Sequence, residues 1–378
     1  MRVLTVLGTR PEVIKLAPVL RVLGARPRTF DVRLCITAQH RDLLDPMLAL
    51  FDLRPDIDLD VMRAAQSPTD VIARVLAGLD PILDAAGGGH PSIGHWRPDW
   101  MVVQGDTTTT LAAALGAHHH RVRVAHVEAG LRTGRLDAPF PEEMNRRLLG
   151  ALADRHFAPT PRARDHLLGE GVPAARVTMT GNTGVDALRW ALEQPAPAAL
   201  AALDLPPDAP VLFVTAHRRE SFGAPLERVC RALREIAARF GPALRVVFSV
   251  HPNPQVDGPV RRGLGGVPGV TLTPPLDYVT CLHLLRRATI VLTDSGGLQE
   301  EAPSVGTPVL VLRDVTERSE GVDLGFAVLV GTDPARIVAE TSRLLEDPGE
   351  YRRRVPAANP YGDGHAAERI ADVLGADL

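Results

Sequence analysis

The sequence predicts an α/β protein of two domains, each built around a parallel β-sheet. The chain has 378 residues, which is enough for two domains of ordinary size. Short apolar runs alternate along it with amphipathic stretches, which is the pattern of βαβ units. The alternation stops at residues 194–210, a segment rich in Pro and Ala, and then begins again. We therefore expect this segment to link the two domains.

In the first domain, strands are predicted at apolar runs, and helices at stretches whose apolar residues have helical spacing. The strands are expected at residues 3–7, 32–36, 101–103, 122–127 and 177–179, and the helices at 11–23 and 41–51. These runs lack polar alternation, which is typical of strands covered on both faces of a sheet. Residues 87–98 are rich in Gly and are predicted to form a loop.

The second domain repeats this order of elements. Its strands are expected at residues 211–215, 245–249, 270–272, 290–293 and 309–312. Its helices are expected at residues 225–240, 281–287, 297–305 and 334–345, and the last stretch of the chain, residues 365–374, is expected to be another helix. Two similar α/β domains usually bind a ligand in the cleft between them, near the carboxyl ends of their strands. Polar residues that follow the predicted strands are therefore the candidates for a functional site.

The composition excludes several classes of protein. With 42 Lys and Arg against 45 Asp and Glu, the net charge of −3 argues against a nucleic-acid or membrane-surface binder. An apolar share of 45% is too high for a disordered chain. The widely spaced Cys35, Cys230 and Cys281 argue against a zinc site or a disulfide framework. Because neither a signal peptide nor a run of about 18 apolar residues is found, we expect a cytoplasmic protein.

The first predicted strand ends at the sequence GTRPE, residues 8–12. A Gly turn followed by Pro in the first helical turn places backbone N–H groups and Arg10 at a helix N-terminus, which favours anions. Lys15 follows one turn later and is the only lysine in the chain. Because an ammonium differs from a guanidinium in shape and hydration, we hypothesise that arginine does not serve at this position. The alternative is an ordinary turn with two solvated charges.

Three carboxylates of the first domain follow predicted strands or open a helix. Asp106, in QGDTTTT, is either a helix N-cap or a carboxylate that faces the cleft. Glu128 lies in HVEAGLRTG, and Glu142 lies in FPEEMNR, where acids also complement the helix dipole. Together the three groups are able to supply an acid and a base of different pKa.

In the second domain, His217 follows a strand and has two arginines beside it, which favours a neutral imidazole near phosphate groups. The sequence TDSGGLQEE brings the N–H groups of Ser295, Gly296 and Gly297 to a helix start, which suits a diphosphate. Glu301 lies one turn later and is placed to accept both hydroxyls of a ribose.

These motifs, in this order and spacing, resemble those of the non-hydrolysing UDP-N-acetylglucosamine 2-epimerases. The matching stretches are GTRPEVIKLAP, TAQHRDLLD, GDTTTTLAAAL, HVEAGLRTG, PEEMNR, GNTGVDAL, HRRESFG, HPNP, LTDSGGLQEEAP, RDVTER and NPYGDGHA. The resemblance implies two Rossmann-like domains of the GT-B type with an interdomain active-site cleft. It implies that residues 1–185 and 360–378 form the domain with the catalytic carboxylates, and that residues 186–359 form the UDP-binding domain.

The resemblance also implies the reaction, which is reversible epimerisation at C2 of UDP-N-acetylglucosamine to UDP-N-acetylmannosamine. A carboxylate would remove the C2 proton, and UDP would leave by anti elimination and return to the bound 2-acetamidoglucal. No cofactor and no metal is implied. The family further implies a homodimer, activation by the substrate at a second site, and a role in polysaccharide biosynthesis.

The family's functional positions are carried over residue by residue. The catalytic positions are Asp106, Glu128, Glu142, His217 and Lys15. The positions that bind UDP and its phosphates are Arg10, Ser295, Gly296, Gly297, Glu301 and Arg313. The positions of the allosteric site are Gln39, His40, Gln66, Arg218 and His251. The sequence departs from the family pattern at Gln104, where a histidine is frequent, at Cys281, where an aromatic is frequent, and at Ser319, where proline is usual.

Three other functions remain as alternatives. A GT-B glycosyltransferase would transfer the sugar to an acceptor and would not need three carboxylates around C2. A non-catalytic sensor would bind a nucleotide sugar without turnover and would tolerate the loss of Asp106 or Glu142. An epimerase of this family could also act on a related UDP-2-acetamido sugar.

Overall fold

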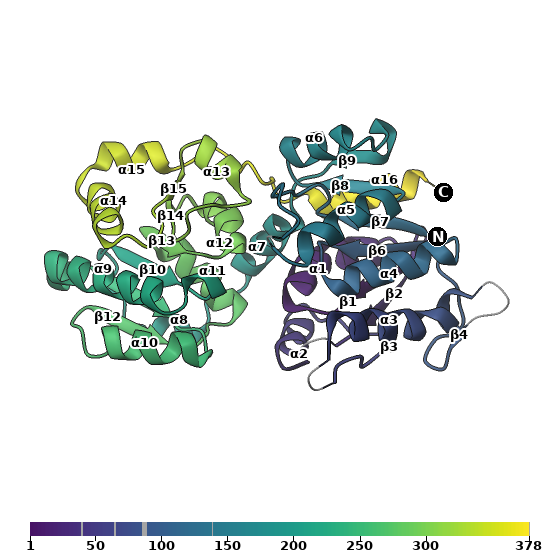
Figure 1. Cartoon of the computed structure of the whole chain (residues 1–378), viewed down its shortest axis with the longest axis horizontal. Coiled ribbons are helices and arrows are strands. Elements are labelled where there is room, and N and C mark those ends of the chain that lie inside the picture. The colour runs from purple at the N-terminus through teal and green to yellow at the C-terminus, as the bar shows by residue number, and fades with distance from the viewer. Residues whose placement is uncertain (39–40, 64–65, 85–88, 138, 378) are drawn as a thin grey trace. The chain divides into compact units, whose positions relative to one another are not determined.

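The computed structural model describes the chain except for residues 39–40, 64–65, 85–88, 138 and 378. The chain divides into two compact units (Figure 1). The N-terminal unit comprises Met1–Ala187 and Tyr361–Leu378, and the C-terminal unit comprises Leu188–Pro360. The divisions expected from the sequence fall after residues 185 and 359.

The N-terminal unit is built around a seven-stranded parallel sheet with the strand order β3-β2-β1-β6-β7-β8-β9. Its strands are β1 (Arg2–Leu7), β2 (Asp31–Ile36), β3 (Ile57–Asp58), β6 (Trp100–Gln104), β7 (Arg123–Val127), β8 (Arg155–Ala158) and β9 (Val177–Met179). Strands β1 and β6 are buried at consecutive positions, so both faces of the sheet are covered there. Strand β9 lies at the edge, and Met179 is 47% exposed. The prediction that this last run is covered on both faces is therefore wrong.

Helices connect the parallel strands of this unit. They are α1 (Arg10–Gly24), α2 (Arg41–Leu50), α3 (Pro68–Leu83), α4 (Thr108–His119), α5 (Glu142–Leu152) and α6 (Pro161–Gly169), with a 3-10 turn at Ala174–Arg176. Two more helices follow the last strand, which are α7 (Thr183–Glu193), continuing past the boundary at Ala187, and α16 (Ala366–Ala376). Thr107 and Thr160 begin α4 and α6 as N-caps, and Ser67 and Asp70 form a capping box at α3. The apolar sides of α3, α4 and α5 share one buried core with β1 and β6.

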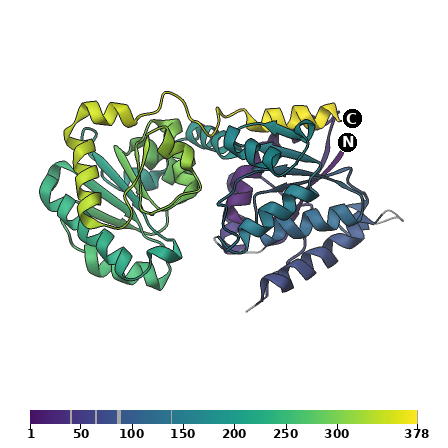
Figure 2. The ribbon, with the colours of Figure 1, turned by 45° about the horizontal axis from the view of Figure 1, so that its top comes forward.

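Helix α16 returns the C-terminal segment to the N-terminal unit, beside α1 (Figure 2). The carboxylate of Asp186 in α7 accepts hydrogen bonds from the N–H groups of Ala366 and Ala367, at 3.3 and 2.8 Å. A carboxylate at this position stabilises the helix N-terminus. At the other end, Arg155 of β8 donates a hydrogen bond of 2.7 Å to Asp377. Both ends of α16 are thus fixed to this unit.

The C-terminal unit contains a six-stranded parallel sheet with the strand order β12-β11-β10-β13-β14-β15. Its strands are β10 (Val211–Thr215), β11 (Arg245–Ser249), β12 (Val270–Thr273), β13 (Ile290–Thr293), β14 (Val309–Val311) and β15 (Ala327–Leu329). Its α-helices are α8 (Ala198–Ala201), α9 (Ala224–Phe240), α10 (Pro254–Leu264), α11 (Tyr278–Arg287), α12 (Gly296–Glu301), α13 (Ser319–Asp323), α14 (Pro334–Glu346) and α15 (Pro348–Arg354). Its 3-10 turns are Arg219–Ser221, Gly241–Ala243 and Ala302–Val305.

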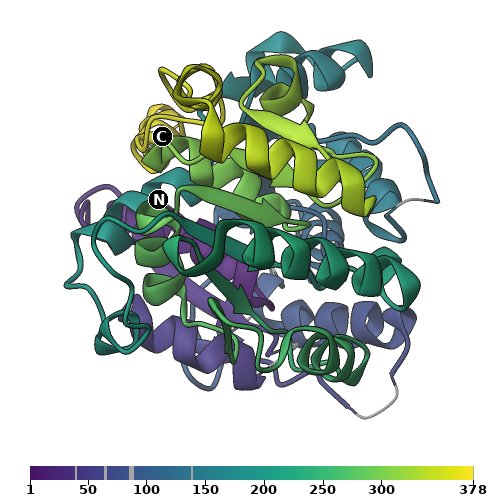
Figure 3. The ribbon, with the colours of Figure 1, turned by 90° about the vertical axis from the view of Figure 1, so that its left-hand side faces the viewer.

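Helices α9, α10 and α14 form a layer against one side of the second sheet, and Figure 3 looks onto this layer. Their apolar residues share one core with alternate residues of β10, β11, β13 and β14. Helices α9 and α10 approach closely at Gly263, where a Cβ atom would lie only 3.0 Å from the Cβ of Cys230. Glycine at this position therefore permits the two helices to pack.

Some elements differ from those predicted. The predicted loop over residues 87–98 contains two short paired strands, β4 (Gly89–His90) and β5 (Gly94–His95). The predicted linker contains helix α8. The helix predicted over residues 297–305 ends as an α-helix at Glu301 and continues as a 3-10 turn. Pro303 explains this change, because it has no N–H for the next α-helical hydrogen bond.

In each sheet the strand order reverses between two central strands, which are β1 and β6 in the first and β10 and β13 in the second. Ligands of open α/β sheets bind at such switch points, beyond the carboxyl ends of the strands. Gly8 and Gly105 follow the two strands of the first pair, and Ala216 and Asp294 follow those of the second. The predicted site residues lie close to these positions in the sequence.

Candidate functional site

Glu128 lies directly after β7 and is held by two side chains from other elements. The Nζ of Lys15, in α1, is 2.6 Å from Oε1 and 2.7 Å from Oε2 of this carboxylate. The side-chain amide of Gln104, at the end of β6, donates a hydrogen bond to Oε2. Glu128 has a φ of +64°, in a region that residues other than glycine rarely adopt. Strained backbone held by its surroundings is typical of functional sites, so this carboxylate is the first candidate for chemistry.

Asp106 lies in the turn after β6, and its carboxylate faces helix α5. Arg146 donates a hydrogen bond of 2.7 Å from Nε to Oδ2 of Asp106, and Asn145 donates one of 2.8 Å to its backbone carbonyl. Thr107, and not Asp106, is the N-cap of α4, since its side chain accepts the N–H of Thr110. The interpretation of Asp106 as a helix cap is therefore wrong, and its carboxylate is available to a ligand.

Two adjacent acids at the start of α5 have different surroundings. Glu143 is fully buried and accepts hydrogen bonds from the N–H groups of Thr133 and Gly134 and from Arg146, at 3.0–3.2 Å. It thereby holds the loop that follows Glu128. Glu142 is half-buried, and its Oε2 is buried without a hydrogen-bond partner among the residues that the structure describes. Buried oxygens without partners are rare, so this environment distinguishes Glu142 from Glu143.

The turn at the start of α1 is closed by an acid of the chain itself. The Oε2 of Glu12 accepts hydrogen bonds from the N–H groups of Gly8 and Thr9, at 3.0 and 2.8 Å. Burial, the largest influence, raises the pKa of Glu12, although hydrogen bonds from Thr9 and Gly8 lower it in part. The anion site predicted from these N–H groups is therefore occupied. Arg10, beside them, is half-buried and forms no ion pair within the described part of the chain.

In the C-terminal unit, His217 and Asp294 follow the paired strands β10 and β13. Asp294 is fully buried, and its Oδ2 accepts hydrogen bonds of 2.8 Å from the N–H groups of His217 and Arg218. Its Oδ1 lies 3.1 Å from Nδ1 of His217. The predicted histidine is therefore fixed to a buried carboxylate through its backbone, and its ring lies close to the second oxygen of that carboxylate.

The start of α12 is covered by the guanidinium of Arg318. A Cβ atom at Gly296 would lie 2.9 Å from Cζ of Arg318, so only glycine leaves room for this contact. Arg318 also donates a hydrogen bond of 2.8 Å to Glu300. The sequence predicts that the N–H of Ser295 is open to a ligand. In the structure it instead donates a hydrogen bond of 2.9 Å to Thr293 Oγ1. A Cβ atom at Gly297 would meet only the hydroxyl of Ser295, at 3.8 Å.

Two further predicted UDP contacts already bind side chains of their own unit. Glu301 accepts a hydrogen bond of 3.3 Å from the hydroxyl of Tyr278. Arg313 is largely buried and donates to Glu220 at 2.7 Å and to Glu317 at 2.9 Å. Burial raises the pKa of Glu317, but Arg313 and Arg318 outweigh this effect and lower that pKa to about 2. Arg313 therefore joins Glu220 and Glu317 through two ion pairs.

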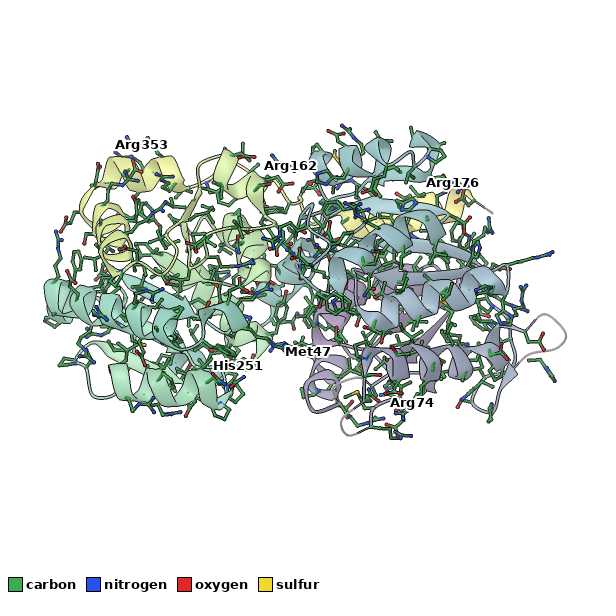
Figure 4. The ribbon with its side chains drawn as sticks, in the orientation of Figure 1. Met47, Arg74, Arg162, Arg176, His251 and Arg353 are labelled. Atoms are coloured by element: carbon green, nitrogen blue, oxygen red, sulfur yellow. The ribbon has the colours of Figure 1, made fainter. Side chains whose placement is uncertain are left out.

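The positions predicted for a second site are divided between the two units. Gln39 and His40 lie outside the described residues. The Oε1 of Gln66 accepts hydrogen bonds of 2.9 Å from the N–H of Arg63 and from the guanidinium of Arg74, which Figure 4 labels. Gln66 therefore holds the segment that precedes α3.

Arg218 and His251 belong to the C-terminal unit. The Nε of Arg218 is buried and has no hydrogen-bond partner within the described residues. The ring of His251, labelled in Figure 4, stacks on that of His217 with a centroid distance of 5.9 Å. These two predicted allosteric positions therefore lie beside a predicted catalytic one.

Sequence reasoning does not identify the residues that contact the predicted site residues. These contacting residues are Gln104, Arg146, Asp294 and Arg318. Asp294 carries the same signal as Asp106 and Glu128, since it follows a buried strand at the switch point. Arg146 and Arg318 lie within the quoted motifs, but nothing in the sequence indicates which carboxylate each arginine contacts.

The described residues include no helix that is long and apolar enough to cross a membrane. Among the same residues, no three or more His, Cys, Asp or Glu side chains are grouped so as to hold a metal ion. Cys35, Cys230 and Cys281 are free thiols.

The sequence is similar to a known enzyme family over most of its length. The family model described as UDP-N-acetylglucosamine 2-epimerase matches residues 23–375. The chain is 49% identical over 381 residues to the UDP-N-acetylglucosamine 2-epimerase of Yersinia pestis, covering 99% of this chain and 98% of the relative.

Solved structures extend the similarity to three dimensions. The UDP-GlcNAc 2-epimerase from Neisseria meningitidis bound to UDP-GlcNAc matches with a TM-score of 0.90 and 40% identity, over 99% of each chain. The glycotransferase of kitacinnamycin matches with a TM-score of 0.65 and 18% identity, over 100% of this chain and 99% of its own, and this likeness concerns the fold alone. The predicted fold class, with two Rossmann-like domains of the GT-B type, is thereby confirmed.

Proposed function

The chain belongs to the UDP-N-acetylglucosamine 2-epimerase family and is an isomerase, and we propose that it interconverts UDP-N-acetylglucosamine and UDP-N-acetylmannosamine. The relative from N. meningitidis with bound UDP-GlcNAc supports this choice of substrate. The observation that carries the proposal is the placement of three carboxylates in the N-terminal unit, with Asp106 after β6, Glu128 after β7 and Glu142 at the start of α5. Such a group suits proton transfer at a sugar carbon.

The proposed reaction breaks a C–H bond that is not activated by a neighbouring carbonyl. A carboxylate accepts the C2 proton, and the C–H electron pair forms a C1–C2 double bond. The C1–O bond breaks in the same elimination, and its electrons stay on the departing UDP. UDP then adds again to C1 of the 2-acetamidoglucal, while a proton is delivered to the opposite face of C2. Cations and N–H groups at the diphosphate would lower the barrier by stabilising the charge of the leaving group.

We assign the proton transfers to the N-terminal unit. The ammonium of Lys15 contacts the carboxylate of Glu128, and the guanidinium of Arg146 contacts that of Asp106, so each acid is held in place by a cation. Glu142 has a buried oxygen without a hydrogen-bond partner among the described residues, and we propose that the substrate provides this partner. The three acids thus have unlike surroundings, which suits separate acid and base roles.

We assign UDP binding to the C-terminal unit. Gly296 and Gly297 would bind the diphosphate through their N–H groups and Ser295 through its hydroxyl, and Glu301 would bind the ribose. Arg318 lies over Gly296 and adds a positive charge at this position. Arg10 and Arg313 remain proposed cationic contacts of the phosphates, and His217 a proposed catalytic group.

Proton NMR of UDP-N-acetylglucosamine in D2O with the protein tests the function. We expect deuterium at C2 and the appearance of the manno isomer. Turnover only after a sugar acceptor is added would indicate a glycosyltransferase instead. Unchanged substrate that nevertheless binds would indicate a sensor, and reaction only with another UDP-2-acetamido sugar would change the substrate.

The assignment of roles predicts opposite effects of substitutions in the two units. Asp106→Asn and Glu128→Gln should each lower the rate of C2 exchange by about 10²-fold or more, because each removes a proton acceptor. Their affinity for UDP, measured by titration calorimetry, should stay near that of the unaltered protein. Glu301→Ala is the matched control and should chiefly weaken UDP binding. A comparable loss of UDP affinity in all three variants would contradict the assigned roles.

The family resemblance supports further proposals about the whole protein. We propose that it is a cytoplasmic homodimer and that its product enters polysaccharide biosynthesis. We also propose that UDP-N-acetylglucosamine activates it at a second site formed by Gln39, His40, Gln66, Arg218 and His251. The Nε of Arg218 is buried without a hydrogen-bond partner among the described residues, which supports a ligand near the Arg218 guanidinium.

A further inference from the structure

One carboxylate oxygen of Asp294 binds a short segment of the C-terminal unit. It is fully buried at the end of β13. Its Oδ2 accepts the N–H groups of His217 and Arg218, both at 2.8 Å, and the hydroxyl of Ser221 at 3.3 Å. The two backbone hydrogen bonds fix the segment that carries His217 relative to the switch point of the sheet.

The second carboxylate oxygen acts on the ring of His217. Oδ1 of Asp294 lies 3.1 Å from Nδ1 of this histidine. No hydrogen bond of suitable geometry reaches this Oδ1 among the described residues, so the contact is one of close approach. Because a lone pair on Nδ1 would face the lone pairs of the carboxylate oxygen at this distance, the ring nitrogen that faces Asp294 carries the proton. In the neutral ring, Nε2 is then the nitrogen with a free lone pair. The side chain of His217 is 38% exposed, whereas Asp294 is inaccessible, so a ligand meets the ring and not the acid.

A second histidine limits the rotation of this ring from its face. His251 stacks on His217 with a centroid distance of 5.9 Å and an interplanar angle of 17°. The Nδ1 of His251 accepts the N–H of Asn253 at 3.2 Å, which fixes His251 in turn. The carboxylate of Asp294 thus lies at one edge of the His217 ring, and the ring of His251 lies over one of its faces.

We propose that Asp294 is a positioning residue that fixes His217 as the Nδ1–H tautomer and so presents Nε2 as a proton acceptor to the substrate. The inference rests on the proposed function, in which His217 takes part in catalysis. It adds to that function a second residue that acts only through His217.

Asp294→Asn tests the proposal because it keeps the size of the side chain and changes its hydrogen bonding. The amide oxygen can still accept the two backbone N–H groups, which turns the amide NH2 toward the ring. A donor at this position requires an unprotonated Nδ1, so the proton of the neutral ring moves to Nε2. We expect kcat to fall by about 10²-fold or more, as for loss of a general base, with a far smaller change in KM.

The tautomer is read directly by long-range ¹H–¹⁵N NMR of the labelled protein, with His217→Gln used to assign the signals. The unaltered protein should show a protonated Nδ1, and Asp294→Asn should show a protonated Nε2. Ser221→Ala is the matched control, because it removes a donor to the same carboxylate without altering the group that faces the ring. It should keep the tautomer and a kcat close to that of the unaltered protein.

The spectrum separates this inference from the proposed function. A proton on Nε2 in the unaltered protein overturns the inference without any variant, even if the protein epimerises its substrate. An active protein in which Asp294→Asn leaves both tautomer and kcat unchanged overturns it as well. An unaltered protein that lacks turnover contradicts the proposed function, while its spectrum still decides whether Asp294 sets the tautomer.

Discussion

Lys15 is the only lysine in the chain, and its ammonium lies between the two oxygens of Glu128. The side chains of the pair are only 14% and 5% exposed, so little space surrounds them. A compact ammonium can approach both oxygens within 2.7 Å from one point, whereas a planar guanidinium needs more room and a fixed orientation. The geometry therefore gives a physical reason for the survival of one lysine in an arginine-rich sequence.

We predict that Lys15→Arg lowers the rate of C2 exchange about tenfold or more, because the larger head displaces Glu128 from its reacting position. Arg21→Lys, on the exposed surface of the same helix, is the control and should leave the rate unchanged. Steady-state rates of the two variants provide the measurement. Nearly normal turnover of Lys15→Arg would reduce the lone lysine to a coincidence of composition.

At the residue level, the sequence predicts acids more readily than it predicts their partners. Asp106 and Glu128 can be found because each follows a buried apolar run. The pairing of Asp106 with Arg146 spans 40 residues and depends on how α5 packs, which no local pattern reports. The different environments of Glu142 and Glu143 likewise follow from the side of α5 on which each lies.

Helices α1 and α4 begin side by side because Glu12 joins their first turns. One oxygen of this buried carboxylate accepts N–H groups of its own turn, and the other accepts the hydroxyls of Thr107 and Thr110, at 2.9 and 3.0 Å. Thr110 also donates to the carbonyl of Gln104, at 2.7 Å. This junction fixes the spacing of the two turns that lead to Lys15 and Asp106.

We predict that Glu12→Gln destabilises the N-terminal unit by about 1–3 kcal/mol, because its amide NH2 would face buried donors that then lose their acceptor. The free energy of unfolding in urea, at an unchanged m-value, provides the measurement. Asp70→Asn alters the acid of the exposed capping box of α3 and serves as the control. An equal shift in the two variants would show that the junction adds nothing beyond helix capping.

At the element level, strands with continuous apolar runs were predictable, whereas short or mixed ones were not. The interior strands β1 and β10 bury nearly every residue, so their sequences carry a strong signal. Strand β3 has only two residues, and β9 lies half-exposed at an edge. Helix α3 lies outside the predicted elements although it has a capping box and an apolar face. Its start could have been found from Ser67 and Asp70.

The response of the whole molecule to acid should depend on two buried histidines. His126 and His156 lie opposite each other on β7 and β8. Burial, supported by nearby positive groups, lowers the pKa of His126 to about 3 and that of His156 to about 4. The unfolded chain binds these protons near pH 6.5, before the folded chain does. The contribution of the two histidines to the free energy of unfolding is therefore fully present above pH 6.5. This contribution is lost progressively as the pH falls below that value.

We predict that the free energy of unfolding falls by about 1.4 kcal/mol per pH unit for each of these histidines between about pH 6.5 and pH 5. His126→Gln keeps a donor for the carbonyl of Gly105 but cannot titrate, so it should remove about half of this slope. His119→Gln, at the exposed end of α4, should leave the slope unchanged. Urea unfolding followed by tryptophan fluorescence at several pH values checks the prediction. Equal slopes in both variants would contradict it.

Because residues 361–378 belong to the N-terminal unit, the C-terminal unit is an insertion within it. During synthesis on the ribosome, α16 emerges only after all of residues 188–360. The inserted unit is continuous in sequence and can fold as it emerges, whereas the unit that begins first must wait for its final helix. Until then, the part of α1 that α16 covers stays exposed, together with Ile370 and Leu374 of the arriving helix. The order of completion is thus the reverse of the order of translation, and nascent chains need protection at this face of α1.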